Sequence, residues 1–131
     1  MFYCCCWLNG TLEIPMYVTS IGDYAFYQCS GLNGVLKIPN NVKTIGICSF
    51  YDCSSFNGSL IIPNSVTSVI SSAFSGCFGF DDDLISSNIQ NINDYVFEKC
   101  SGFSKDLKIP RYCKSIGIGS FSGCSGFYHW L

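Results

Sequence analysis

The residues of this sequence best suited to chemistry are its ten cysteines and its single histidine, His129. Ten cysteines in 131 residues are typical of a secreted domain cross-linked by disulfides or of a zinc-binding domain. The most plausible zinc ligands would be Cys4, Cys5 and Cys6 together with His129. However, the sequence contains no C-x-x-C pair, and the histidine stands at the opposite end of the chain. We therefore expect no metal site.

Other catalytic or ligand-binding chemistry has less support. The carboxylates of Asp81, Asp82 and Asp83 could attract calcium, but the run lacks the alternating ligands and the glycine of a calcium loop. We interpret it as a solvated turn. The sequence has no G-x-S-x-G motif and no phosphate-binding glycine loop, and its one histidine lies near a terminus. The expected protein is not an enzyme and carries no cofactor.

The spacing of the cysteines offers another explanation for their number. Six of them recur at intervals of 23 or 24 residues: Cys5, Cys29, Cys53, Cys77, Cys100 and Cys124. Leucine or phenylalanine follows each of the six after three residues. A short repeat of this kind cannot bury its apolar positions alone, but it can do so when stacked on copies of itself as a solenoid. Matching residues then lie roughly 4.8 Å apart along the stack.

In such a stack the six cysteines form one inward file and act as small buried hydrophobic residues. Cys113 replaces a valine of another inward column. Parallel cysteine side chains are poorly aimed for disulfides, so we favour reduced thiols and keep disulfides as the alternative. Cys4, Cys6 and Cys48 fall at variable positions that we expect to be exposed, and they are the candidates for reactive thiols.

Each repeat is predicted to contain two extended segments and one turn. The segment L-x-I, as in 36–38, indicates a short strand, with an Asn-Gly turn before it and a proline after it. The segment V-x-x-I-G indicates a second extended piece, and A-F-x-x-C indicates a tight or short helical turn. The fourth copy has Ser86-Ser87 in place of Ile-Pro, lacks one residue before Ile89 and has Asn93 in place of glycine. We expect a local irregularity there, within a coil that still forms.

The pattern L-x-I-P-x-x-V-T-S-I-G-x-x-A-F-x-x-C-S-G-L resembles the BspA-like leucine-rich repeat, which is common in bacterial and protist proteins. The resemblance covers essentially the whole chain. It implies a β-rich (α/β-type), right-handed leucine-rich-repeat solenoid of parallel short strands, with about five coils of 24 residues. It also implies a surface-associated protein that binds host or neighbouring-cell macromolecules. The motif is specific for the repeat type but not for a function, because one fold hosts many activities.

We expect one solenoid domain over 1–131, with coils at 1–24, 25–48, 49–72, 73–95, 96–119 and a partial 120–131. Met1 falls in mid-coil and Leu131 at the opening of a strand, so we interpret the chain as a fragment of a longer array. The alternative is a structural or self-associating protein whose uncapped ends stack on one another. A reading frame without selected function is a third interpretation, suggested by the irregular fourth copy.

The candidate binding site is the outward face of the L-x-I strands, whose side chains vary while the inward columns do not. Its members are Thr11, Glu13, Val35, Lys37, Ser59, Ile61, Asp83, Ile85, Asp106 and Lys108. Ile61 and Ile85 would form an apolar centre within a polar rim, as expected of a surface that binds a protein partner or a second copy of the chain. Ordinary solvent-exposed surface is the alternative reading of the same residues.

Composition excludes two classes of partner. The net charge is −2 and the sequence has no basic run, so we expect no nucleic acid. No apolar stretch approaches the roughly 18 residues of a membrane-spanning helix, so we expect no membrane insertion. The opening MFYCCCWL lacks the features of a signal peptide, and the chain itself does not indicate a compartment. Asn9 and Asn57 match glycosylation acceptors, but we favour the turn chemistry of Asn-Gly, because the same pair recurs before Val35, where the acceptor hydroxyl is missing.

Overall fold

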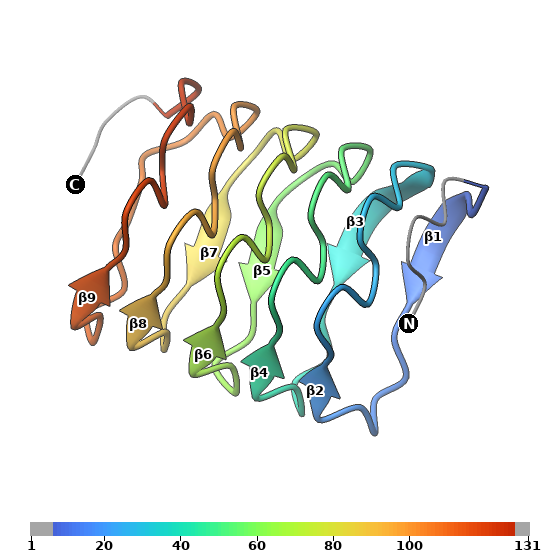
Figure 1. Cartoon of the computed structure of the whole chain (residues 1–131), viewed down its shortest axis with the longest axis horizontal. Helices are drawn as coiled ribbons and strands as arrows, with labels where there is room; N and C mark the ends of the chain where they lie inside the picture. Colours follow the sequence, from blue (N-terminus) through green and yellow to red (C-terminus); the bar gives the residue numbers. More distant parts are fainter. Residues whose placement is uncertain (1–6, 128–131) are drawn as a thin grey trace.

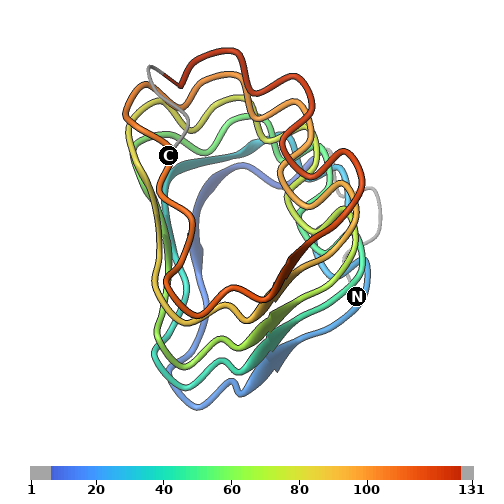
Figure 2. The same ribbon diagram turned by 90° about the vertical axis from the view of Figure 1, so that its left-hand side faces the viewer.

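The structure is a computed structural model, and it describes residues 7–127. The chain winds as a parallel β-solenoid in which each coil lies directly on the one before it (Figure 1). Seen from the C-terminal end, the coils superimpose as a single irregular ring (Figure 2). The solenoid predicted from the repeat spacing is thus confirmed. Among the described residues, none lies in a helix long and apolar enough to cross a bilayer.

Two parallel sheets form two sides of the ring, and they correspond to the two predicted extended segments. The four-stranded sheet has the order β1-β3-β5-β7 and contains β1 (Gly10–Glu13), β3 (Leu32–Lys37), β5 (Leu60–Ile62) and β7 (Leu84–Ser86). The five-stranded sheet has the order β2-β4-β6-β8-β9 and contains β2 (Ser20–Ile21), β4 (Thr44–Ile45), β6 (Ser68–Val69), β8 (Asn91–Ile92) and β9 (Ser115–Ile116). The prolines that follow the L-x-I strands cannot donate to a ladder, which keeps these strands short.

The strand register follows the sequence period with two local changes. In the four-stranded sheet Lys37 lies opposite Ile61, which lies opposite Ile85. In the five-stranded sheet the interval shortens from 24 to 23 at β8, where Asn91 pairs with Ser68, so the coil absorbs the missing residue as expected. Between β1 and β3 the register shifts, because Glu13 pairs with Lys37 whereas Thr11 pairs with Asn33 rather than with Val35.

The third side of each coil is a series of tight turns and not a short helix. The N–H groups of Ala25, Tyr27 and Cys29 donate to the carbonyls three residues before them. Tyr24 and Gln28 have φ of 56°, and a left-handed residue every four positions cannot belong to a right-handed helix. The alternating N–H groups donate to the next coil instead, as Phe26 does to the carbonyl of Ser49 at 2.7 Å. This side is therefore also a ladder.

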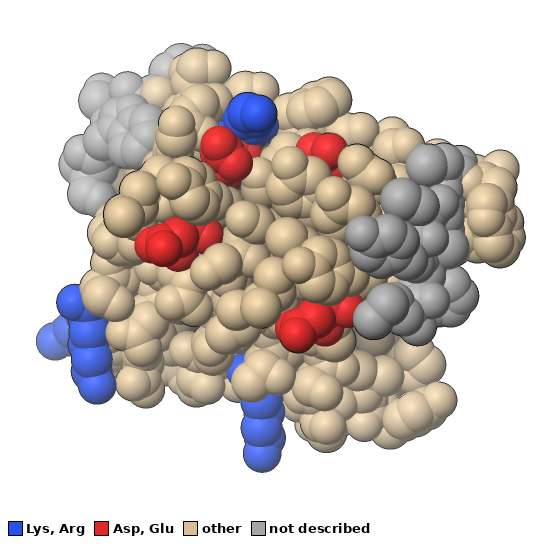
Figure 3. Space-filling view, in the orientation of Figure 1, with Lys and Arg blue, Asp and Glu red and all other residues tan. Residues whose placement is uncertain are grey.

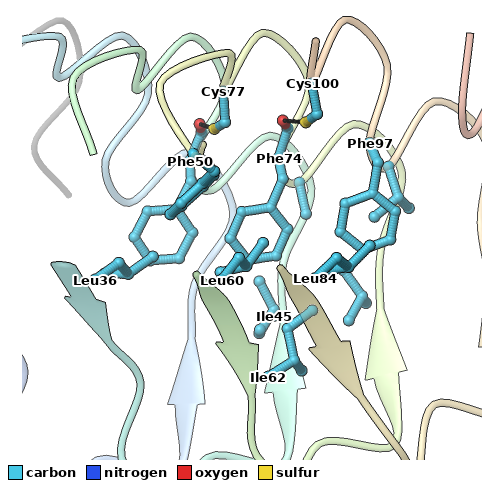
Figure 4. Packing of buried hydrophobic residues seen from close by; sticks show 14 of the residues in the cluster. Leu36, Ile45, Phe50, Leu60, Ile62, Phe74, Cys77, Leu84, Phe97 and Cys100 are labelled. Carbon is cyan, nitrogen blue, oxygen red and sulfur yellow. Dashed lines mark hydrogen bonds between the residues drawn. The ribbon is translucent and has the colours of Figure 1, made fainter. Parts of the chain in front are cut away.

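Two files of phenylalanine rings lie in the interior. Figure 4 shows Phe50, Phe74 and Phe97 of one file beside Leu36, Leu60 and Leu84. One file stacks with centroids 5.3–5.9 Å apart and contains Phe26, Phe50, Phe74, Phe97 and Phe121. The other stacks at 5.4–6.1 Å and contains Phe56, Phe80, Phe103 and Phe127. Offset or parallel aromatic pairs at these distances are favourable beyond the apolar area they bury. The core is thus a set of ladders that runs the length of the stack.

The repeat glycine after the second strand is required where the coil before it carries an aspartate. Asp23 accepts the N–H of Ile47 at 2.8 Å, which draws the next coil close. A Cβ on Gly46 would then lie 2.7 Å from the backbone nitrogen of Asp23. Asp94 and Gly117 repeat this arrangement. Ile70 follows a coil without that aspartate, so its departure from the consensus is accommodated.

Candidate binding face on the four-stranded sheet

The outward side chains of the four-stranded sheet, here called the outer strand face, alternate with buried ones along each strand. Leu60 and Ile62 point into the core with 0% and 2% of their surface exposed, whereas Ile61 between them in β5 is 49% exposed. Alternation of this kind follows from the two-residue period of a strand. The structure places seven of the predicted residues in exposed positions, namely Thr11, Glu13, Val35, Lys37, Ile61, Ile85 and Lys108.

A continuous row of side chains runs across this face. Glu13, Lys37, Ile61 and Ile85 are successive partners in the parallel pairing of β1, β3, β5 and β7. Val35 lies one outward position away from Lys37, and it is 47% exposed. Ile61 and Ile85 therefore form an exposed apolar strip, which the Lys37 ammonium and the Glu13 carboxylate continue at one end, and Val35 lies on the same face beside Lys37. The sequence-based grouping is realised in this part of the sheet.

Three of the predicted residues are half-buried and engaged within the protein. Ser59 Oγ donates to Asp82 Oδ2 at 3.1 Å and accepts the N–H of Asp83 at 3.3 Å. Asp83 Oδ1 is a buried oxygen without a hydrogen-bond partner among the described residues. Asp106 is also half-buried. These residues contribute less to the exposed outer strand face than to contacts within the protein.

The face does not extend over the fifth copy in the same form. The four-stranded sheet ends at β7, and residues 106–109 do not form a further strand of it. Lys108 is exposed, but it lies on an irregular segment beyond the last strand. The ladder that aligns Lys37 with Ile61 and Ile85 thus does not fix its position. The structure brings six candidates onto one sheet, namely Thr11, Glu13, Val35, Lys37, Ile61 and Ile85. Ser59 and Asp83 directly precede β5 and β7, and Asp106 and Lys108 lie beyond the last strand of this sheet.

A groove of about 580 Å³ borders the same face over β1 and β3. Four of the predicted residues line it, namely Thr11, Glu13, Val35 and Lys37. Sequence reasoning missed the other wall, which includes Met16, Pro39 and Asn40. These residues follow the strands, and the Asn41 amide holds the two loops together by donating to the carbonyl of Met16 at 2.7 Å. The only signal for this wall in the sequence was the repeat proline: Pro39 is one of these prolines, and Met16 and Asn40 each directly follow one.

Charge is sparse on the surface as a whole. In the orientation of Figure 1, acidic and basic side chains appear as separate small groups on a surface that is otherwise uncharged (Figure 3). The ion pair between Lys105 and Asp82 spans 3.6 Å, and both side chains are at least half exposed. An exposed pair of this kind contributes little to stability, about 0–1 kcal/mol. No broad field of one sign is available in this view to attract a polyanion or polycation.

The predicted inward file of cysteines is confirmed over the described residues. Cys29, Cys53, Cys77 and Cys100 are fully buried, and Cys124 is 2% exposed. Each of the last four donates its S–H to the carbonyl of a phenylalanine in the coil before it, as Cys77 does to Phe50 at 3.0 Å and Cys100 to Phe74 at 3.1 Å (Figure 4). The cysteines are thus both core residues and hydrogen-bond donors between coils.

These thiols are unsuited to nucleophilic chemistry. Burial raises the pKa of Cys124 to about 11, and it raises the pKa of Cys77 and of Cys100 well above the ordinary value. Cys53 is shifted in the same direction, and burial is again the main cause of its higher pKa. A thiol without an accessible thiolate neither attacks substrates nor binds metals at neutral pH. The file acts as part of the scaffold.

The predicted exposure of Cys48 is wrong. Its side chain is half-buried at a left-handed position with φ of 49°, and burial raises its pKa despite a hydrogen bond with Ser72. Cys113, predicted to lie in an inward column, is also half-buried. The seven described cysteines are free thiols. Cys4, Cys5, Cys6 and His129 lie outside the described residues, so the structure does not test their predicted roles.

The acidic run 81–83 is an irregular segment with a bend at Asp82 that leads into β7, and its side chains are not simply solvated. Asp81 Oδ1 accepts the N–H of Gly58 at 2.8 Å, which ties the run to the preceding coil. Gly58 has φ of 70°, as expected for the glycine of an Asn-Gly turn. Within 7–127, no three His, Cys, Asp or Glu side chains are grouped so that they could hold a metal ion. Asn57 and Asn9 are exposed at such turns, and glycosylation there stays a prediction.

Comparison with known proteins identifies the repeat. Residues 1–128 match the model of the BspA type leucine rich repeat region with six copies. The structure is similar to that of a Treponema pallidum leucine rich repeat protein, TpLRR, with a TM-score of 0.81 and 29% identity. It is also similar to a leucine rich cell surface protein from Faecalibacterium prausnitzii A2-165, with a TM-score of 0.61 and 26% identity. No match was found among curated proteins.

These similarities cover the chain but only part of each relative. They include 94% and 93% of this chain, whereas they span 56% of the Treponema protein and 39% of the Faecalibacterium protein. Together with the stacked coils, the aligned strand ladders and the matched residues 1–128, they establish the family. The chain belongs to the BspA-type leucine-rich repeat family.

Proposed function

We propose that this chain is a non-enzymatic interaction module of a surface protein, and that it binds another protein through the outer strand face. The observation that carries the proposal is the exposed apolar strip of Ile61 and Ile85, with Val35 on the same face beside Lys37. The exposed fractions of these three side chains, 44–49%, are large for aliphatic residues. Exposed apolar strips within a polar rim are typical of protein–protein contact sites.

The charges beside the strip favour a particular partner chemistry. Lys37 and Glu13 are adjacent in the ladder and border the groove, so the expected partner offers a carboxylate to Lys37 and a cation to Glu13. Its central side chains would be aliphatic or aromatic and would lie against Ile61 and Ile85. Such an arrangement gives affinity through the apolar contact and orientation through the charges. A cell-surface location agrees with the Faecalibacterium relative, which is a leucine rich cell surface protein.

The stack of coils explains how the face could bind without rearrangement. Below it lie the buried leucines and the phenylalanine files, and three ladders of backbone hydrogen bonds hold the coils in place. A surface fixed in this way loses little conformational entropy when a partner binds. The buried ladders thus hold the outward residues in register, while the outward residues provide recognition.

Site-specific photocrosslinking tests the proposal. A benzophenone amino acid at Ile61 is compared with one at Thr67, which is exposed outside the four-stranded sheet, using proteins displayed on intact cells as the partners. The expected result is a discrete crosslinked protein from position 61 alone, which is lost when Lys37→Glu is added. A crosslinking pattern that is equal at both positions, or unchanged by Lys37→Glu in a folded variant, would reject the outer strand face.

The rival interpretation, self-association through the ends, is distinguished by sedimentation velocity. Stacking predicts that the sedimentation coefficient rises with protein concentration, because each end-to-end contact joins two molecules and so forms more often at higher concentration. Binding of a different protein through the outer strand face predicts a constant value over the same range. A rise in sedimentation coefficient that persists in the Lys37→Glu variant would favour assembly through the ends.

A further inference from the structure

A second groove, separate from the outer strand face, crosses three successive coils where the turn side leads into the next strand. Its volume is about 420 Å³, within the usual range for small-molecule sites. The lining residues are Gln28, Ser30, Asp52, Ser54 and Phe78. They combine one aromatic ring, one carboxylate, one amide and two hydroxyls, and they include no lysine or arginine. None of them belongs to the binding face proposed above.

Phe78 is the member that departs from the repeat. It follows Cys77 directly, and serine stands at the equivalent position after four of the other five cysteines of the file: Ser30, Ser54, Ser101 and Ser125. The ring is 56% exposed, so the core does not require it. Four copies of the coil carry serine at this position, which shows that stacking does not depend on an aromatic residue. The ring is thus a free apolar wall beside the two hydroxyls of the groove.

Asp52 is held in the groove by the shape of the coil that follows. Its backbone is left-handed, with φ of 54°, and its Oδ1 lies where a Cβ of residue 76 would be. Gly76 is therefore the residue that makes room for the carboxylate. The described residues supply no hydrogen-bond donor to this carboxylate, although the side chain is half-buried. A ligand with hydroxyl donors would satisfy it.

From these features we propose that the groove binds a neutral sugar, with one hexopyranose ring against Phe78. The less polar C–H face of the sugar would cover the aromatic ring, whose negative π-face attracts the positively polarised hydrogens. Sugar hydroxyls would donate to Asp52 and exchange hydrogen bonds with Ser54 and the amide of Gln28. The mixture of donors and acceptors in the lining suits hydroxyl groups, which act as both.

Charged ligands fit the same residues less well. An anion such as a phosphate would meet the Asp52 carboxylate and no cationic side chain. A quaternary ammonium ion is typically held by several aromatic faces, whereas this groove offers one ring and three neutral polar groups. The aromatic wall and the neutral hydrogen-bonding groups together favour a polyol with one apolar face.

Saturation-transfer NMR tests this assignment with four probes: the methyl glycosides of glucose, galactose, mannose and N-acetylglucosamine at millimolar concentration. At least one should receive saturation, and most strongly at the ring hydrogens of a single face. Phe78→Ser should weaken its binding about ten-fold, because one aromatic contact is lost. This variant restores the residue found in the other copies, so it should fold like the parent chain.

Two further variants separate this site from the outer strand face. Asp52→Asn keeps the size of the side chain and should lower the affinity, because an amide is a weaker acceptor than a carboxylate. Ile61→Ala lies on the outer strand face and should leave sugar binding unchanged. Absence of saturation with all four sugars, or equal binding by Phe78→Ser, overturns the proposal. Saturation of tetramethylammonium in place of the sugars would assign the groove to a cation.

Discussion

Replacing Phe74 by alanine should be among the most destabilising single changes in the chain. The side chain is fully buried, and its ring stacks on Phe50 at 5.3 Å and on Phe97 at 5.9 Å. Removing a buried phenylalanine costs about 3–5 kcal/mol through lost transfer energy and the cavity that remains. This range already includes lost ring contacts, and each of the two stacks is worth about 0.5–1.5 kcal/mol. We therefore expect a loss near the upper end, about 4–5 kcal/mol, in the free energy of unfolding.

Urea unfolding followed by circular dichroism measures this loss, with two comparison variants. Phe121→Ala removes a half-buried member of the same file and should cost less than Phe74→Ala. Phe74→Leu keeps most of the buried volume and should cost about 1–2 kcal/mol, so it remains measurable if the alanine variant does not fold. The reasoning is refuted if Phe74→Ala costs under about 1 kcal/mol, or if it costs no more than Phe121→Ala.

Three further predictions concern the close contacts, the thiols and the faces of the strand. Gly46→Ala should cost about 1–3 kcal/mol in the free energy of unfolding, because its Cβ would lie 2.5 Å from Asp23 Oδ1. Gly22→Ala should change it by less than about 0.5 kcal/mol, because no atom lies within 4 Å of the added Cβ. Equal costs of the two variants in thermal unfolding would contradict this prediction. The free energy of unfolding should fall above about pH 8.5, because the thiols of the unfolded chain ionise there while Cys124, with a pKa of about 11, stays protonated in the folded state. The fall should be smaller in Cys124→Ser. A free energy of unfolding that stays constant up to about pH 10 would contradict this prediction. Leu36→Ala should cost about 2–5 kcal/mol and Lys37→Ala under about 0.5 kcal/mol, because of the two side chains only that of the leucine is buried. A larger loss for Lys37→Ala than for Leu36→Ala in urea unfolding would contradict the assignment of Leu36 to the core.

The fold was predictable because the repeat spacing constrains contacts that are distant in sequence. Once Cys29, Cys53 and Cys77 are recognised as equivalent, their coils must lie on one another, and the strands, the inward columns and the shortened fourth copy follow. The possible helix in the A-F-x-x-C turn was not realised. Its left-handed positions hold ordinary residues such as Tyr24 and Gln28, and no glycine in those copies signals the backbone conformation.

The candidate site was only partly predictable, because burial depends on packing details that spacing does not give. Alternation along the strand was enough to place Lys37 and Ile61 outward. It could not show that Ser59 and Asp83 are engaged with each other, since that contact depends on the loop between coils. The groove beside Phe78 was missed for a similar reason: the sequence shows an aromatic residue in a serine column, but it does not show that residues of three coils meet there to line a groove.

The outer strand face requires contact between outward residues of successive coils, and methyl-resolved NOE spectroscopy measures this contact directly for Ile61 and Ile85. The two residues are paired across β5 and β7, and both are exposed. We predict strong NOEs between their methyl groups, and weak or no NOEs from either residue to the buried rings of Phe74 and Phe80. NOEs from Ile61 to those rings, without a contact to Ile85, would contradict the register on which the outer strand face rests.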